Sequence, residues 1–102
     1  MIFKPDLAAK VADGTKTQTR RHKLRYEIGK DYAVQPGRGK HAICRIRITD
    51  VRQERLLDIS DADVKAEGFD GREAFLERWE QINHAPAGKY EQVYVYEFEL
   101  MS

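Results

Sequence analysis

The stretch that most constrains the fold is QVYVYEFEL, residues 92–100. In an extended chain, one face of this stretch carries large apolar side chains at every second position: Tyr94, Tyr96, Phe98 and Leu100. The opposite face begins with two valines and ends with two glutamates: Val93, Val95, Glu97 and Glu99. Because β-branched and aromatic residues favour strands, the pattern predicts a strand that lies inside a sheet.

A second strand is predicted at His41–Val51, where apolar and polar residues also alternate. One face is apolar (Ala42, Cys44, Ile46 and Ile48), and the other carries Ile43, Arg45, Arg47 and Thr49. The shorter stretch Lys30–Val34 also fits a strand, and Pro36–Gly39 fits a loop.

Three helices are predicted from their start and stop signals. The first begins at Lys4-Pro5, since proline suits the first helical position, and ends at Gly14. The second begins at Ser60, which forms a capping box with Asp63, and ends at Gly68.

A third, longer helix is predicted to start from Asp70 and Glu73, which repeat the capping signal. Its apolar side chains form one stripe: Phe75, Leu76, Trp79 and Ile82. We expect this stripe, Trp79 included, to belong to the core and not to a base-stacking platform.

Strands separated by short helices, without regular β-α-β alternation, predict an α+β fold with a mixed or antiparallel sheet. Such a sheet can close as a small barrel. At 102 residues the chain has a common domain size, so one domain over residues 1–102 is expected.

The composition argues against a membrane or secreted protein. The mean hydropathy is −0.69, and no apolar run approaches the roughly 18 residues of a membrane span. The first residues do not have the pattern of a signal peptide. Cys44 is the single cysteine and cannot form an internal disulfide. These features predict a cytoplasmic protein without membrane partners.

Charge is distributed unevenly along the chain. Residues 1–55 contain 14 Lys and Arg against 6 Asp and Glu, whereas residues 56–102 contain 4 against 11. One interpretation is that the two halves pack together and neutralise each other. The alternative is a basic face that binds phosphates or RNA.

The run GTKTQTRR, residues 14–21, is unusual for a plain scaffold. In a flat strand Lys16 and Thr19 point to opposite faces, so they can converge only if a bulge or turn lies between them. A buried lysine that is not fully protonated can take the proton of a threonine hydroxyl and activate it for attack. The alternative is a polar strand whose threonines simply favour the β conformation.

Glu67 is the second candidate, because it precedes the predicted helix end at Gly68. The partial negative charge of a helix C-terminus disfavours a carboxylate, which would suit a proton-transfer group. The alternative is an ordinary solvated glutamate. His22, His41, His84 and Cys44 do not have zinc-ligand spacing, so no metal site is predicted.

Several of these motifs, in this order, resemble the ASCH domain family, whose members are related to the PUA-like RNA-binding barrels. They are the run Gly14–Arg21, Gly29 with the DYAV strand, the EGF of residues 67–69, Phe75 with Trp79, and Val93, Val95 and Phe98. The resemblance covers nearly the whole chain. It implies a small β-barrel of five or six strands, flanked by about three helices, with a cleft on one side.

The resemblance also implies an activity. Some small bacterial ASCH proteins are amidohydrolases that remove the acyl group from N4-acetylcytidine with a lysine, a threonine and a glutamate. Matched to their motif, the catalytic residues here are Lys16, Thr19 and Glu67. We expect Thr17, Arg20 and Arg21 to bind the substrate, a nucleoside, with Arg21 or backbone N–H groups steadying the oxyanion. Neither a metal nor an organic cofactor is expected.

Other ASCH relatives suggest a different class, an RNA-binding module or a metal-independent ribonuclease. Basic residues that could follow a phosphate backbone are Arg20, Arg21, His22, Lys23, Arg25, Arg45, Arg47, Arg52 and Arg55. A third hypothesis is a ligand sensor that keeps the pocket without catalysis.

Overall fold

The computed structural model describes residues 1–101. In this range the chain forms the helices α1 (Pro5–Ala12), α2 (Asp61–Ala66) and α3 (Arg72–Asn83), and the strands β1 (Gln18–Arg21), β2 (Asp31–Val34), β3 (Cys44–Arg55) and β4 (Gln92–Leu100). A single 3₁₀ turn, Leu56–Asp58, follows β3. The predicted α+β class is confirmed.

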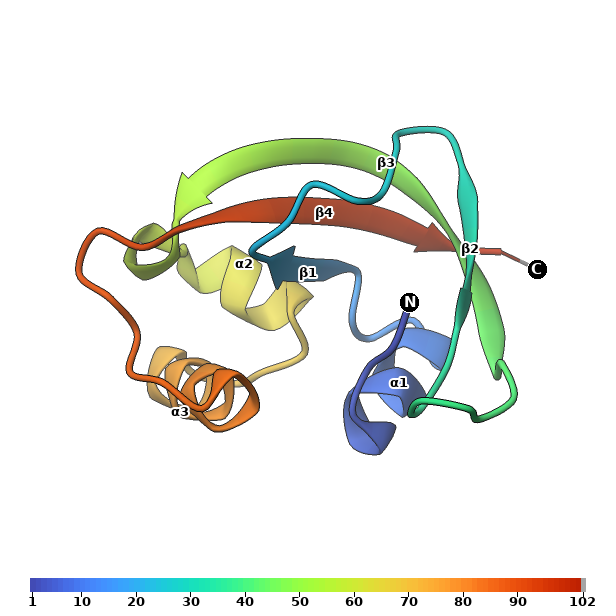
Figure 1. The fold of residues 1–102 in the computed structure, drawn as a ribbon, viewed down its shortest axis with the longest axis horizontal. Coiled ribbons are helices and arrows are strands. Elements are labelled where there is room, and N and C mark those ends of the chain that lie inside the picture. The colour runs from blue at the N-terminus through green and yellow to red at the C-terminus, as the bar shows by residue number, and fades with distance from the viewer. Residues whose placement is uncertain (102) are drawn as a thin grey trace.

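The four strands form one sheet in the order β1-β4-β3-β2, and every neighbouring pair is antiparallel. The sheet curls over the helices as half of a barrel (Figure 1). The family resemblance implied five or six strands, whereas residues 1–101 form four. An isolated parallel bridge between Ile2 and Gln35 adds a contact beside β2.

Strand β4 lies between β1 and β3, as predicted for a strand inside the sheet. Tyr96 and Phe98 join a core cluster with α1, while Val93 and Val95 join a second cluster with α2 and α3. Both faces of β4 are therefore packed. Leu100, at the end of the strand, remains exposed.

Strand β3 begins at Cys44, later than predicted, and continues to Arg55. Ile46 and Ile48 are buried, as the alternation predicted. A register shift between Ile48 and Asp50 marks a β-bulge. The extension past Val51 is polar, and it is held by pairing with the first residues of β4, which local sequence does not reveal.

The signals for the first two helices are confirmed. Helix α1 has Pro5 at its first position, and Gly14 follows it with a φ of 85°. At the start of α2, the Asp63 amide donates to Ser60 Oγ at 3.1 Å. Gly68, which was predicted to end this helix, has a φ of 99°, a conformation that glycine adopts readily.

The predicted start of α3 is wrong. Gly71 is the N-cap residue and no side chain caps the helix, so Asp70 does not have the predicted capping role. Phe75 and Trp79 are buried as expected, whereas Ile82 is 36% exposed. The amphipathic stripe predicted the helix correctly, whereas the capping signal at Asp70 does not correspond to a cap in the structure.

Ion pairs join the basic and the acidic halves of the chain. Lys16 pairs with Glu67, Arg20 with Asp63, and Arg52 with Glu97. The two halves therefore neutralise each other in part. Among the residues described, none of the helices has the length and apolar character needed to cross a membrane.

Candidate active site

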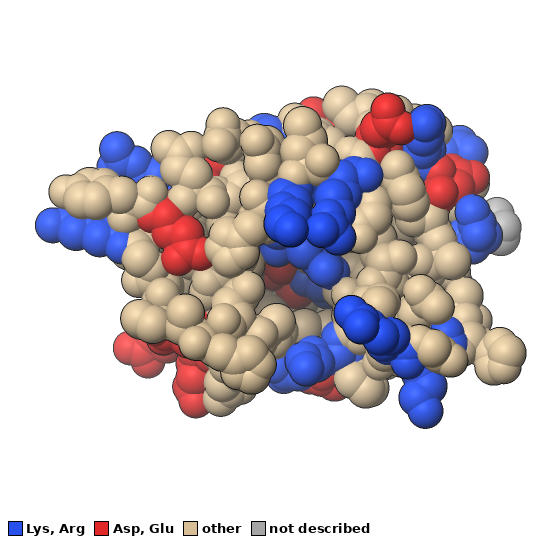
Figure 2. All heavy atoms as spheres, viewed as in Figure 1, with Lys and Arg blue, Asp and Glu red and all other residues tan. Residues whose placement is uncertain are grey.

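A cavity of about 610 Å³ lies between β1, the start of α1, the end of α2 and one side of α3. Figure 2 shows the hollow near the middle of one face, with Lys and Arg side chains on both sides and acidic atoms inside it. Its volume falls in the range of small-molecule sites, roughly 300–1,000 Å³.

The central feature of the cavity is an ion pair between Lys16 and Glu67. Lys16 Nζ lies 2.6 Å from Glu67 Oε1 and 2.8 Å from the Glu67 main-chain oxygen. The exposed fractions of the two side chains are only 2% and 4%. Two of the three protons of the Lys16 ammonium group are thus used by Glu67, and one is left over.

Main-chain hydrogen bonds bring these two residues together. The Lys16 amide donates to the Lys10 carbonyl at 3.0 Å, and the Thr17 amide donates to the Ala66 carbonyl at 2.8 Å. The turn after α1 is therefore docked on the C-terminal end of α2, where Glu67 is the C-cap residue.

Gly68 allows the close approach of Lys16. A Cβ at this position would lie 3.2 Å from Lys10 Cδ and 3.5 Å from Lys16 Cβ, and the φ of 99° is unfavourable for other residues. Lys10 Nζ also donates to the Gly68 carbonyl at 2.6 Å. The glycine of the EGF motif is thus favoured chiefly by its backbone conformation, with one tight contact to the Lys10 side chain.

Burial lowers the pKa of Lys16, although the charge and hydrogen bond of Glu67 act in the opposite direction. The positive charges of Arg21 and Arg20 add to the lowering. A lysine with a lowered pKa is neutral more of the time near physiological pH, and a neutral amine can accept a proton.

Arg20 holds the other side of Glu67. Its Nη1 lies 3.0 Å from Glu67 Oε2 and 2.5 Å from Gln18 Oε1, and its Nη2 lies 2.9 Å from Glu54 Oε1. Asp63 lies 3.3 Å from the same Nη2. Both terminal nitrogens of Arg20 are thus hydrogen-bonded within the protein, and its expected contact with a substrate stays a prediction.

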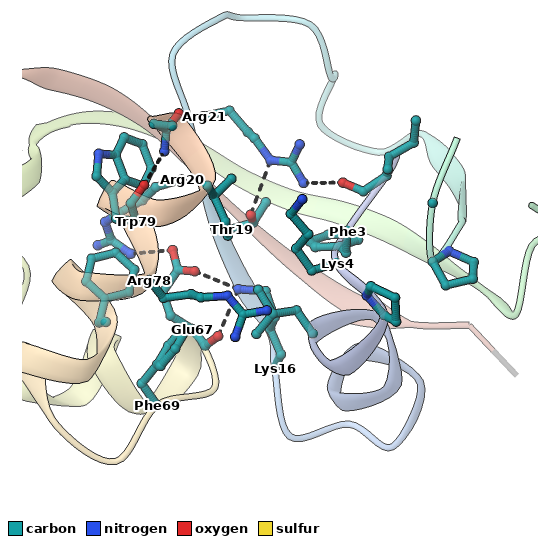
Figure 3. Close-up of a pocket in the computed structure, with 18 of the residues that line it drawn as sticks. Phe3, Lys4, Lys16, Thr19, Arg20, Arg21, Glu67, Phe69, Arg78 and Trp79 are labelled. Atoms are coloured by element: carbon teal, nitrogen blue, oxygen red, sulfur yellow. Dashed lines mark hydrogen bonds and ion pairs between the residues drawn. The ribbon is translucent and has the colours of Figure 1, made fainter. Parts of the chain in front are cut away.

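Thr19 lies in β1 and lines the cavity with Lys16. Strand β1 begins at Gln18, so Lys16 belongs to the preceding turn and the two residues need not follow strand alternation. Arg21 Nε donates to Thr19 Oγ1 at 3.4 Å, a long hydrogen bond (Figure 3). Within residues 1–101 Thr19 Oγ1 has no hydrogen bond to Lys16 Nζ.

Arg21 is fixed at the cavity wall by three contacts. Besides Thr19, it donates through Nη2 to the Ile2 carbonyl at 2.9 Å, and its guanidinium lies 4.9 Å from the Phe3 ring centroid. Arg21 therefore reaches the cavity, as expected for a substrate contact.

The structure does not bring Thr17 to the cavity. Its side chain is exposed, and its main-chain groups are used by the amide of Phe98 and the carbonyl of Ala66. Strand alternation places Thr17 on the same side as Thr19 only if the strand extends that far, and it does not.

Sequence reasoning missed the aromatic wall of the cavity. Phe69, Phe75 and Trp79 line it, and the His22 ring packs edge-on against Trp79 with ring centroids 5.1 Å apart. Trp79 is buried, as predicted for a core residue, but one side of it faces the cavity. The four-residue spacing of Phe75 and Trp79 was the available signal, and it fits a core and a pocket wall equally well.

Some of the arginines proposed for RNA binding are paired with carboxylates, and others line a second hollow. Arg47 pairs with Asp31 at 2.7 Å and Arg52 with Asp63 at 2.8 Å, so these side chains are neutralised. A second hollow of about 230 Å³ is lined by Arg21, His22, Lys23, Arg25 and Tyr26.

In residues 1–101 no three His, Cys, Asp or Glu side chains form a group that could hold a metal ion.

Comparison with known proteins supports the assignment of the fold. The sequence model of the ASCH domain matches residues 1–101. The chain belongs to the ASCH domain family. No curated protein matches this ASCH chain in sequence.

Three solved structures, two of them described as ASCH proteins, are similar to this chain. The ASCH domain from Lactobacillus crispatus has a TM-score of 0.69 at 18% identity, over 93% of this chain and 70% of that one. ASCH from Zymomonas mobilis has a TM-score of 0.71 at 14% identity, over 97% and 64%. Protein EF3133 from Enterococcus faecalis has a TM-score of 0.69 at 18% identity, over 94% and 67%. At such identities the similarity establishes the fold alone.

Proposed function

We propose that this ASCH protein is an amidohydrolase that removes an acyl group from the exocyclic N4 of cytidine-type nucleosides. The observation that carries the proposal is the buried pair of Lys16 and Glu67, 2.6 Å apart, in the wall of a cavity that Thr19 also lines. A base, a hydroxyl and a carboxylate in one cavity are the groups that acyl transfer needs.

In the proposed reaction the neutral amine of Lys16 accepts the Thr19 hydroxyl proton. Two N–H groups of the Lys16 amine are directed to Glu67. The nitrogen lone pair, which accepts the proton, is therefore directed away from Glu67. The Thr19 oxygen attacks the acyl carbon and forms a tetrahedral oxyanion. In a variant of this step, Thr19 orients a water molecule that attacks in its place.

The Nε of Arg21, 3.4 Å from Thr19 Oγ1, or a backbone N–H group nearby is the proposed donor to the oxyanion. The carbon–N4 bond then breaks, and the proton taken up by Lys16 passes to N4, which leaves as the amine of cytidine. Water hydrolyses the Thr19 ester and releases the carboxylic acid. The net reaction adds one water molecule and involves no oxidation or reduction.

Glu67 is proposed to hold Lys16 in place and to stabilise its ammonium form after proton uptake. The aromatic wall of Phe69, Phe75 and Trp79 offers an apolar surface for the planar base. These roles divide the cavity into a polar reacting end and an apolar end.

The proposal is tested by incubating the protein with N4-acetylcytidine and separating the products by chromatography. Cytidine and acetate should appear in equal amounts, and Lys16→Ala should abolish their formation with an unchanged circular dichroism spectrum. Lys65→Ala, which removes an exposed lysine of α2, is the matched control. Deacetylation by Lys16→Ala at the native rate would refute the mechanism.

RNA binding is the second candidate, and the hollow lined by Arg21, Lys23 and Arg25 favours it. Contacts to several phosphates weaken steeply as salt rises, whereas turnover of a neutral nucleoside should change little. Incubation with single-stranded RNA at two salt concentrations, followed by electrophoresis, separates binding and cleavage from deacetylation.

A further inference from the structure

The cavity carries more positive charge than its chemistry requires. Six cationic residues line it: Lys4, Lys16, Arg20, Arg21, Arg38 and Arg78. Glu67 is the one carboxylate among the described residues of the lining, and it serves Lys16 and Arg20. Arg78 is neutralised from outside by Asp6, at 2.6 and 3.0 Å.

Among the residues that the structure describes, the remaining three cations have no carboxylate partner. In residues 1–101 no carboxylate oxygen lies within 4.0 Å of Lys4, Arg21 or Arg38. Arg21 is half-buried, and its only acceptors in this range are the neutral oxygens of Thr19 and Ile2. A guanidinium drawn out of water without an anion is costly, and a bound anion would remove that cost.

The backbone gathers these three cations at one rim of the cavity. Ile2 and Gln35 form a parallel bridge, supported by the Phe3 amide, which donates to the Gln35 carbonyl at 3.0 Å. Because the bridge is parallel, both segments leave it in the same direction, one toward Lys4 and the other toward Arg38. Arg21 joins this rim through its hydrogen bond to Ile2 (Figure 3).

We infer that the rim of Lys4, Arg21 and Arg38 binds a phosphate group, so that the substrate is a cytidine-type mononucleotide in preference to the uncharged nucleoside. The inference rests on the proposed function for the identity of the base. A phosphate monoester carries about −1.5 to −2 charge at pH 7. Two guanidinium groups and an ammonium match it, since arginine binds phosphate oxygens bidentately and lysine binds them as a point charge.

The size and position of the cavity favour one nucleotide. The rim and the pair of Lys16 with Glu67 belong to the same cavity of about 610 Å³, and Arg21 links them, since its Nε faces Thr19 and its Nη2 faces Ile2. A longer nucleic acid would need a site for the next phosphate, and the hollow beside Lys23 and Arg25 is the place where it would lie.

Calorimetric titration tests the inference with cytidine, cytidine 5′-monophosphate, inorganic phosphate and a short oligocytidylate. The native protein should bind the monophosphate at least tenfold more tightly than cytidine, as expected for charge-assisted hydrogen bonds. Lys4→Ala combined with Arg38→Ala, both at exposed positions, should reduce this ratio to about twofold. Arg45→Ala, an exposed arginine outside the cavity, should leave the ratio unchanged.

Equal affinity of the native protein for cytidine and its monophosphate would overturn the inference. Oligocytidylate binding that is tighter than monophosphate binding, and that is lost on Lys23→Ala with Arg25→Ala, would also overturn it and assign the cations to RNA. Deacetylation of N4-acetylcytidine is measured in parallel. Deacetylation without a preference for the monophosphate would refute only the phosphate binding by the rim. A preference for the monophosphate without deacetylation would refute only the proposed reaction.

Discussion

Lys16 Nζ donates to the Glu67 carboxylate at 2.6 Å, although 51 residues separate the two in sequence. Both side chains are almost entirely withdrawn from solvent. The contact joins the turn after α1 to the C-terminal end of α2. It also lets one carboxylate influence the pKa of the proposed base.

The pH dependence of turnover should report the state of Lys16. Because burial lowers the pKa of Lys16, the neutral amine should form at lower pH than in an exposed lysine. The value of kcat/KM should therefore rise with pH through this lowered pKa and level off above it. Lys16→Arg keeps the positive charge but cannot serve as a base, and should lose about 100-fold or more in kcat/KM across the range. A Lys16→Arg enzyme with the native profile would rule out Lys16 as the base.

Glu67→Gln should move the rising limb of that profile to lower pH. The charge of Glu67 raises the pKa of Lys16 against the larger effect of burial, so its removal lets the pKa fall further. The change also leaves Arg20 and Lys16 without their shared anion, which should reduce the free energy of unfolding by about 3–5 kcal/mol. Glu77→Gln, at an exposed position of α3, is the control. A shift of the limb to higher pH would contradict this account.

Thr19→Val should abolish deacetylation and leave the fold intact. Valine matches threonine in shape and favours a strand, so the change removes the hydroxyl from a residue that is 4% exposed. Thr19→Ser keeps a hydroxyl and should retain activity within about tenfold. Mass spectrometry of the native protein mixed with substrate should detect an acyl group on Thr19. Full activity of Thr19→Val would exclude both the covalent role and the water-orienting role.

Gly68→Ala should destabilise the protein by about 1–3 kcal/mol, because the φ of 99° is strained for alanine. The added Cβ would also lie 3.2 Å from Lys10 Cδ, a tight contact, and a shift of this backbone, which carries Glu67, should lower kcat/KM in the surviving folded protein. The matched control is Gly71→Ala, since a Cβ there meets no atom within 4 Å. Its effect should stay within about 1 kcal/mol. Chemical denaturation measures both variants, and equal effects would show that the packing against Lys16 is unimportant.

Local signals predicted the elements that depend on local physics. Pro5 and Gly14 bounded α1, and Ser60 with Asp63 marked the start of α2. Alternation predicted that β4 is packed, because a strand inside a sheet needs apolar side chains on its pleated faces. The predicted cap at Asp70 was wrong, since a residue type alone does not decide whether its side chain turns to the helix end.

The site was only partly predictable, because its geometry depends on contacts between distant segments. The sequence suggested Lys16, Thr19 and Glu67 but did not reveal that Lys16 precedes β1, which lets it share a cavity with Thr19. Arg20 was expected to bind the substrate, and the sequence did not reveal its partners on β3 and α2. Trp79 looked like core because burial and cavity lining use the same apolar side chains.

The position of β4 in the chain has a consequence for biosynthesis. This strand pairs with both β1 and β3 and supplies residues to both core clusters, yet it is the last of the four to leave the ribosome. A nascent chain that ends before Gln92 has no partner for β1, so the Lys16 turn is held to the end of α2 only by contacts such as the hydrogen bond from the Thr17 amide to the Ala66 carbonyl. Such long-range pairing is intrinsically slow, and the sheet that supports the pair of Lys16 and Glu67 should be complete only after translation has passed residue 100.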